Sequence, residues 1–175
     1  MDAEIITTGT EILLGEIVDT NAAWMARRLR DLGINLFYKT TVGDNLDRIV
    51  AAMRQGLDRS DLVLVTGGLG PTVDDVTRDA AALATDRDLV LDDACLASIE
   101  AIFARWGRKL SDNNRLQAYL PAGSIPVFNP VGTAPGFIVE VDRKGRHPAM
   151  LICLPGVPRE MMHLMQETIE PFLAQ

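Results

Sequence analysis

Residues 63–77 hold the groups whose types and spacing best suit chemistry. The segment begins as an apolar, β-branched run typical of a buried strand. Three glycines within four residues and two adjacent carboxylates follow: Gly67, Gly68, Gly70, Asp74 and Asp75. A strand that ends in glycines and continues as a helix exposes backbone N–H groups, which suit a phosphate. A divalent cation could then bridge the two carboxylates to that phosphate.

The same residues also have a purely structural interpretation. Glycines after a strand commonly form a tight turn, and an aspartate at a helix start is favoured for capping and for the helix dipole. Gly67-Gly68-x-Gly70 is not the GxGxxG motif of dinucleotide-binding folds, and no GxxxxGK[ST] motif occurs. Capping accounts for one aspartate, and the adjacent second one favours a metal-binding role.

The elements that must position this segment alternate between strand and helix. Strands are predicted at residues 4–8, 34–42 and 61–66, with helices between them, and this order predicts a parallel sheet covered by helices on both faces. Because ligands bind beyond the carboxyl ends of such strands, four acidic side chains are expected near one another on one rim: Glu11, Asp44, Asp74 and Asp75.

The second half of the chain reads differently. Residues 91–120 have a helical pattern, and residues 129–136 form a loop rich in glycine and proline that we expect to be ordered within the site. A hairpin is predicted from residues 137–141 and 149–154, and the last helix is predicted to start within residues 155–160.

Composition limits the class of protein. A chain of 175 residues suits one domain, and its net charge of −7 argues against nucleic acid or an anionic membrane as the partner. Cys95 and Cys153 form no CxxC motif, and two histidines are too few for a zinc site. With no signal peptide or membrane-spanning run in the sequence, a cytoplasmic protein is expected.

Several segments together resemble the CinA-type proteins. They are residues 8–16 with Thr20-Asn21 after them, residues 66–72 with Asp74, Asp75 and Thr77, residues 132–136, and residues 154–158 with Glu160-Met161. The resemblance implies the molybdopterin-binding superfamily and an α/β fold, a three-layer α/β/α sandwich with a mostly parallel sheet. It also implies one such domain over residues 1–175. The C-terminal amidase domain of many CinA proteins is not expected, because the sequence ends at Gln175.

For function, the resemblance implies a metal-dependent pyrophosphatase that hydrolyses ADP-ribose or a similar nucleoside diphosphate sugar. Asp75, Asp44 and Glu11 would be catalytic, and Asp44, Asp74 and Asp75 would hold a divalent ion such as Mg, Mn or Co. The substrate-binding residues would be Thr8, Gly9, Thr10, Gly67, Gly68, Gly70, Thr72, Thr77, Asn114, Gln117, Gly132, Thr133, Gly136, Pro155 and Gly156. The family often has a lysine where this chain has Leu116. The absence of that lysine would weaken or alter the activity.

Two other functions remain open at this stage. One is molybdopterin binding with adenylylation, and the other is a catalytically silent module that binds a nucleotide or pterin. In each case the ligand is a small molecule. Apolar helix positions near the C-terminus, including Met161, Met162 and Met165, favour a homo-oligomer, with a dimer expected and a trimer as the alternative. Arg27, Arg28 and Arg30 are expected to form a solvated helix face. Gly68→Val is expected to abolish nucleotide binding with the fold intact, because a side chain there would block the close approach of the ligand to the backbone.

Overall fold

The fold centres on a six-stranded sheet, seen in a computed structural model that describes residues 1–174. Its strands run in the order β2-β1-β3-β8-β7-β6. The first four are mutually parallel, and β7 is antiparallel to both of its neighbours. The strands are β1 (Asp2–Thr8), β2 (Asn35–Val42), β3 (Leu62–Thr66), β6 (Ile125–Val127), β7 (Gly136–Val141) and β8 (Ala149–Leu154). The mostly parallel sheet and the hairpin between the last two strands are thus confirmed.

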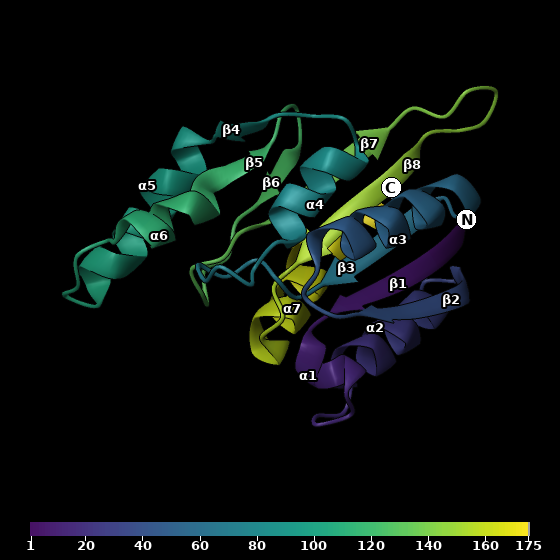
Figure 1. Cartoon of the computed structure of the whole chain (residues 1–175), viewed down its shortest axis with the longest axis horizontal. Helices are drawn as coiled ribbons and strands as arrows, with labels where there is room; N and C mark the ends of the chain where they lie inside the picture. Colours follow the sequence, from purple (N-terminus) through teal and green to yellow (C-terminus); the bar gives the residue numbers. More distant parts are fainter. Residues whose placement is uncertain (175) are drawn as a thin grey trace.

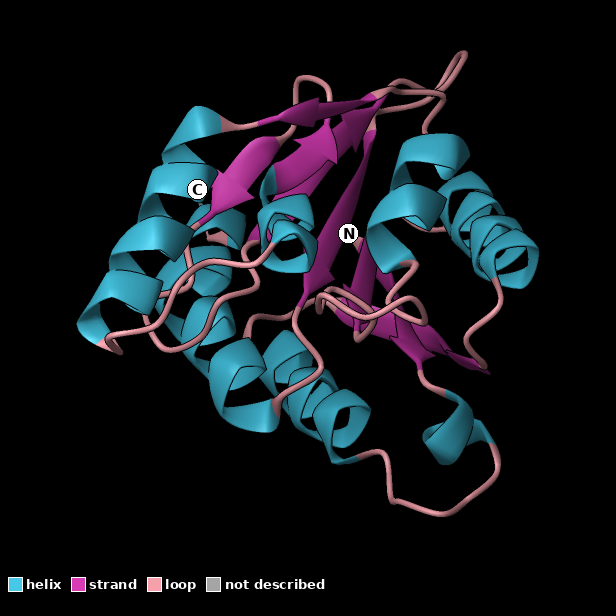
Figure 2. Cartoon of the chain, turned by 60° about the vertical axis from the view of Figure 1, so that its left-hand side comes forward, coloured by secondary structure: helices cyan, strands magenta, loops and turns pink. Residues whose placement is uncertain are grey.

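Helices cover both faces of this sheet (Figure 2). Because successive strand residues point to opposite faces, Val63 and Val65 pack in one core, and Leu62 and Leu64 pack in the other. The first core includes α3 (Leu46–Arg59) and α4 (Thr77–Ala84), and the second includes α2 (Thr20–Asp31), α7 (Pro158–Leu164) and the π-helical turn η2 (Met165–Ile169). The expected three layers are therefore present.

Side-chain caps set where the main helices begin. Asp19 accepts a hydrogen bond from the Ala22 N–H at 2.8 Å, so it caps α2. Asn45 caps α3 in the same way, through the Arg48 N–H at 3.1 Å. Beyond the end of α2, Gly33 has φ +73°, the left-handed conformation that glycine adopts without strain.

Residues 89–121 form an arm beside the main sheet, at the left of Figure 1. It contains α5 (Asp93–Arg105), α6 (Asp112–Arg115) and η1 (Leu116–Ala118), and two short antiparallel strands, β4 (Leu89–Leu91) and β5 (Tyr119–Pro121). The sequence predicted the helices of this arm but not its strands, because three-residue strands carry no periodic signal. The same holds for β6. Between β1 and α2 the chain forms a one-turn helix, α1 (Thr10–Leu13).

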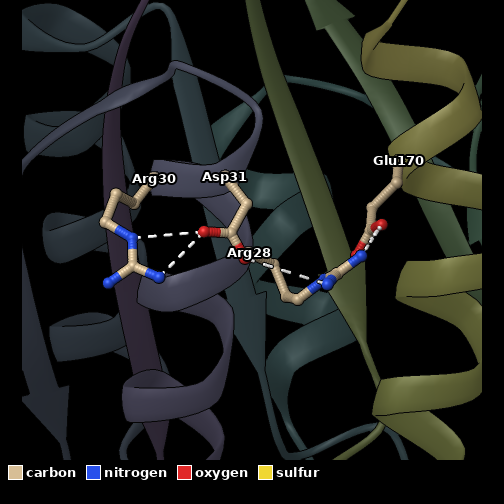
Figure 3. Close-up of polar contacts among 4 residues, drawn as sticks. All are labelled: Arg28, Arg30, Asp31 and Glu170. Carbon is tan, nitrogen blue, oxygen red and sulfur yellow. Dashed lines mark hydrogen bonds and ion pairs between the residues drawn. The ribbon is translucent and has the colours of Figure 1, made fainter.

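The arginines of α2 do not all form the solvated face that the sequence suggested. Figure 3 shows Arg28 reaching from α2 to Glu170 at the start of α8 (Glu170–Leu173). Its Nε and Nη2 donate to the two carboxylate oxygens at 2.6 and 2.5 Å. Arg30 instead pairs with the adjacent Asp31 and keeps 73% of its side chain exposed. Arg28 therefore ties the C-terminal segment to the sheet's helical layer.

Two cysteines and two methionines pack in the hydrophobic core. Cys95 and Cys153 are free and buried, and burial raises the pKa of the Cys95 thiol to about 12. Both thus act as small apolar residues. Met161 and Met165 are fully buried against α2, so they do not form the exposed apolar face inferred from the sequence. Within residues 1–174, no helix has the length and hydropathy needed to cross a membrane.

Candidate active-site cleft

A cleft of about 600 Å³ opens at the carboxyl ends of β1, β3 and β8. This is the rim that the sheet topology predicted for a ligand. Most of the predicted site residues line it: Thr8, Gly9, Glu11, Asp44, Gly67, Gly68, Gly70, Asp74, Asp75, Gln117, Thr133, Pro155 and Gly156. Segments far apart in the sequence therefore meet here, including all four of the predicted acidic residues.

Three predicted threonines support the cleft without lining it. The Thr10 N–H donates to Asp44 Oδ2 at 2.9 Å, and the Thr72 hydroxyl donates to Asp75 Oδ2 at 2.6 Å. Thr77 is fully buried, with its hydroxyl 3.2 Å from that of Thr8. These hydroxyls and N–H groups position neighbouring side chains.

The other three predicted residues outside the lining also have structural contacts. Asn114 donates to the Gln117 side chain at 3.3 Å. Gly136 begins β7, where a Cβ would lie 2.7 Å from the Cys153 carbonyl oxygen. Gly132 lies under the Glu160 carboxylate, which a Cβ would strike.

The glycine turn after β3 presents free backbone donors. Gly67 and Gly68 have φ +107° and +66°, which explains the need for glycine at both. The Gly67 N–H donates to the Leu154 carbonyl at 3.1 Å, so it does not serve the ligand as the sequence suggested. Among the hydrogen bonds of residues 1–174, none uses the next three N–H groups, those of Gly68, Leu69 and Gly70. Consecutive N–H groups without partners in a turn suit an anion.

Two side chains, Arg78 and Gln117, hold the Leu69 carbonyl. Arg78, which is 5% exposed, donates to it at 2.8 Å, and Gln117 donates at 3.4 Å. Since a trans peptide directs its C=O and N–H in opposite directions, these bonds point the Gly70 N–H away from Arg78. Desolvation lowers the pKa of the buried Arg78 guanidinium, and the nearby charges of Asp79 and Asp75 oppose that shift.

Three glycines near the cleft lie directly beneath carboxylates. A Cβ on Gly9 would lie 2.8 Å from Glu11 Oε1, and a Cβ on Gly70 would lie 2.5 Å from Asp75 Oδ2. Gly132 has the same relationship to Glu160. Each glycine therefore makes room for an acidic side chain, in addition to any contact with a ligand.

Charge in the cleft is entirely acidic. The lining holds six carboxylates and, within residues 1–174, no Lys, Arg or His; the acidic residues are Glu11, Asp19, Asp44, Asp74, Asp75 and Glu160. No three His, Cys, Asp or Glu side chains of this part of the chain are grouped closely enough to hold a metal ion. The predicted carboxylates thus share a cleft but do not form a complete ligand set by themselves.

Sequence reasoning missed several polar residues of the cleft, among them Asn21 and Glu160. Glu160 accepts a hydrogen bond from Asn129 Nδ2 at 2.7 Å. Desolvation raises the pKa of the Glu160 carboxyl, although the Asn129 hydrogen bond and Arg159 oppose the shift. Both residues lie in segments that the sequence analysis had quoted, Thr20-Asn21 and Glu160-Met161, but neither was given a role.

Comparison with known families identifies the fold and the cleft-bearing domain. The family model described as "Probable molybdopterin binding domain" matches residues 4–175. The chain belongs to this family. Within it, the chain is CinA-like: it is 40% identical to the protein CinA from Thermoplasma acidophilum, whose crystal structure superimposes with a TM-score of 0.87. That match covers 98% of this chain and 97% of that one.

Curated relatives give the same result over the domain. A competence-damage inducible protein from Acetivibrio thermocellus is 46% identical over 175 residues, which is 100% of this chain and 41% of the relative. Its counterpart in Caldicellulosiruptor saccharolyticus is 48% identical over 99% of this chain and 41% of its own length. The chain therefore spans about two fifths of these relatives.

The wider fold is shared with molybdenum-cofactor proteins. The molybdopterin biosynthesis enzyme MoaB from Thermus thermophilus superimposes on the CinA-like domain with a TM-score of 0.61 at 19% identity, covering 99% of this chain and 96% of that one. At this identity the likeness establishes the fold, and the chemistry has to be argued from the cleft.

Proposed function

We propose that this CinA-like domain is a metal-dependent pyrophosphatase acting on ADP-ribose or a similar nucleoside diphosphate sugar. The observation that carries the proposal is the pairing of a free anion-binding turn with an acid-only lining. The N–H groups of Gly68, Leu69 and Gly70 suit a phosphate, while six carboxylates around them repel one. A diphosphate can occupy such a cleft only together with a cation.

The carboxylates fit a hard divalent cation. Hydrogen bonds from Thr10 and Thr72 each hold one oxygen of the Asp44 and Asp75 carboxylates, respectively. Carboxylate oxygens are ligands that hard cations prefer. Magnesium takes one or two carboxylates and completes its shell with water and substrate phosphates, so it needs no closed three-residue cluster. Asp44, Asp75 and Asp74 would hold the ion, which would neutralise charge on the diphosphate.

The chain's own groups would then do the rest. The free N–H groups of the turn would bind oxygens of one phosphate and stabilise the charge that grows there during reaction. Glu11 would accept a proton from the water that attacks phosphorus, and the bridging P–O bond would break. For ADP-ribose the products are AMP and ribose 5-phosphate. A cleft of about 600 Å³ is large enough for a ligand of this size.

The test is product analysis with purified domain, ADP-ribose and Mg²⁺, Mn²⁺ or Co²⁺ in turn. We expect equal amounts of AMP and ribose 5-phosphate. Asp75→Asn should lose at least about tenfold of the rate, the usual cost of removing an orienting or ligating group. A matched control is Asp58→Asn, which lies outside the cleft and should keep the rate of the wild type. No hydrolysis with any of the three ions would reject the proposal.

A second candidate function is molybdopterin binding with adenylylation. The family description and the fold shared with MoaB favour it. It predicts that molybdopterin binds to the domain and is adenylylated in the presence of ATP and a divalent ion, with no hydrolysis of ADP-ribose. The same product analysis therefore separates the two candidates.

A further inference from the structure

Asn21 has an unused hydrogen-bond acceptor in the cleft wall. The residue is 7% exposed, lies in the first turn of α2, and lines the cleft. Within residues 1–174, its Oδ1 is the only buried side-chain nitrogen or oxygen without a hydrogen-bond partner. Because buried polar atoms are nearly always paired, this oxygen points to a missing donor.

The orientation of the Asn21 amide is fixed by its neighbours. Nδ2 donates to Thr66 Oγ1 at 3.1 Å and to the Gly156 carbonyl at 2.8 Å. Thr66 gives its own proton to the Pro155 carbonyl at 2.9 Å, so its oxygen can only accept from Asn21. A flipped amide would set Oδ1 against two acceptors. Oδ1 is therefore the group left for a ligand.

An acceptor at this position selects the chemistry of its partner. Ionised phosphate oxygens are themselves acceptors, so the phosphate cannot bind here. A cation would need further anionic ligands, but each oxygen of the neighbouring Asp19 carboxylate already accepts a hydrogen bond, from the Ala22 N–H at 2.8 Å and the Thr7 hydroxyl at 2.7 Å, which makes Asp19 a poorer ligand for a cation. A neutral hydrogen-bond donor fits best, and sugar hydroxyls supply one.

The position of Asn21 also suits a sugar. Its hydrogen-bond partner Thr66 directly precedes the glycine turn, and a Cβ on its other partner, Gly156, would lie 3.1 Å from the Gly67 α-carbon. Asn21 is thus anchored to the segment that presents the free N–H groups. In a sugar phosphate, hydroxyls likewise lie only a few bonds from the phosphate.

We propose that Asn21 Oδ1 accepts a hydrogen bond from a ribose hydroxyl of the nucleoside diphosphate sugar. Asn21 is then a specificity-determining residue that favours ribose over deoxyribose. This assignment rests on the proposed function, because it takes the sugar and diphosphate as parts of one ligand. The cost of losing the hydroxyl arises because Oδ1 is then buried without a partner.

The test measures binding, not turnover. The probes are the α,β-methylene analogue of ADP-ribose, which cannot be hydrolysed, and two versions of it that lack the 2- and 3-hydroxyls of either the adenosine ribose or the distal ribose. Calorimetry with Mg²⁺ gives Kd for each. In the wild type, we expect one dideoxy version to bind about tenfold more weakly than the intact analogue. This comparison needs no variant, so it stands even if substitutions at Asn21 impair folding.

Binding to variants of the domain shows whether Asn21 causes this loss of affinity. In Asn21→Ala, the intact analogue should bind as weakly as that dideoxy version, and the two should no longer differ. Asn35→Ala, a change to an exposed asparagine at the start of β2 and outside the cleft lining, should keep the discrimination of the wild type. Equal binding of all three probes to the wild type, or undiminished discrimination in Asn21→Ala, would overturn the assignment alone. Failure of the intact analogue to bind at all would overturn the proposed function and this assignment with it.

Discussion

The Asp75 carboxylate lies directly against the α-carbon of Gly70, so that a Cβ on Gly70 would be 2.5 Å from Asp75 Oδ2. Gly70 has no left-handed φ, so alanine suits its backbone and only the carboxylate has to move. That movement would break the hydrogen bonds from Thr72. The glycine therefore places both a free N–H group and the acidic side chain beside it.

Gly70→Ala is expected to lower the hydrolysis rate about tenfold or more, as Asp75→Asn does, while the domain still folds. The matched comparison is made in an Asp75→Ala background, where the same Gly70→Ala change should have little further effect, because the displaced group is already gone. Rates and circular dichroism spectra of the four proteins give the answer. Equal losses in both backgrounds would show that Gly70 acts independently of Asp75.

Glu160 should make the domain less stable at neutral pH. Desolvation raises the pKa of its carboxyl in the folded protein, so the folded state disfavours the charged form. The loss of folding stability from Glu160 is absent below the pKa of this carboxyl in the unfolded chain, about pH 4. It develops as pH rises from that value to the higher pKa of the folded protein, and it is complete above the folded pKa. Glu160→Gln should therefore raise Tm at pH 7 and leave it unchanged near pH 3.5. The amide oxygen of glutamine can still accept from Asn129.

Thermal denaturation at both pH values checks this prediction. The control is Glu140→Gln, because Glu140 is exposed on β7. A lower Tm for Glu160→Gln at pH 7 would mean that the charged carboxylate stabilises the fold.

Arg28 and Arg30 offer a matched pair for stability. Glu170 keeps only 12% of its side chain exposed and receives two hydrogen bonds from Arg28. Arg28→Ala leaves that carboxylate largely buried without its partner, so Tm should fall clearly. Arg30→Ala removes a contact between largely exposed groups on adjacent residues and should leave Tm almost unchanged. Similar shifts for the two variants would contradict the assigned role of Arg28.

We expect the domain to be a dimer, although the methionines that first suggested this are in the core. Exposed apolar side chains lie instead in the loop after α1: Leu14 is 67% exposed and Val18 is 83% exposed. Val18 also lines the cleft, so a partner subunit on this loop would help to close it. Light scattering at micromolar concentration should give the dimer mass, and Val18→Glu should shift it toward the monomer. A monomer mass for the wild type would show that one chain builds the whole cleft.

The sequence predicted the parts of this molecule that local patterns determine. The alternation of apolar strands with helical segments was enough to predict the layered sheet and its rim. The commitment of the Gly67 N–H to Leu154 was not predictable, because it depends on the pairing of β3 with β8, whose partners are distant in sequence. The same is true of the orphaned oxygen of Asn21, which depends on Thr66 and Gly156.

The structure also changes the expected outcome of the Gly68→Val substitution. A side chain at Gly68 would strike the Thr77 hydroxyl, and its φ of +66° strains any other residue. Gly68→Val is therefore expected to disturb the fold, so the earlier expectation of intact folding was wrong. Gly70→Ala is the better probe of the turn.

The central claim is that an acid-only cleft takes a diphosphate on the free N–H groups of its glycine turn only with a divalent cation. The most direct measurement is calorimetric titration of the wild-type domain with the α,β-methylene analogue of ADP-ribose, once with Mg²⁺ and once with excess chelator. We predict binding with Mg²⁺ and at least about tenfold weaker binding without it, because six carboxylates would then face the diphosphate unscreened. Equal affinity under the two conditions would contradict the account.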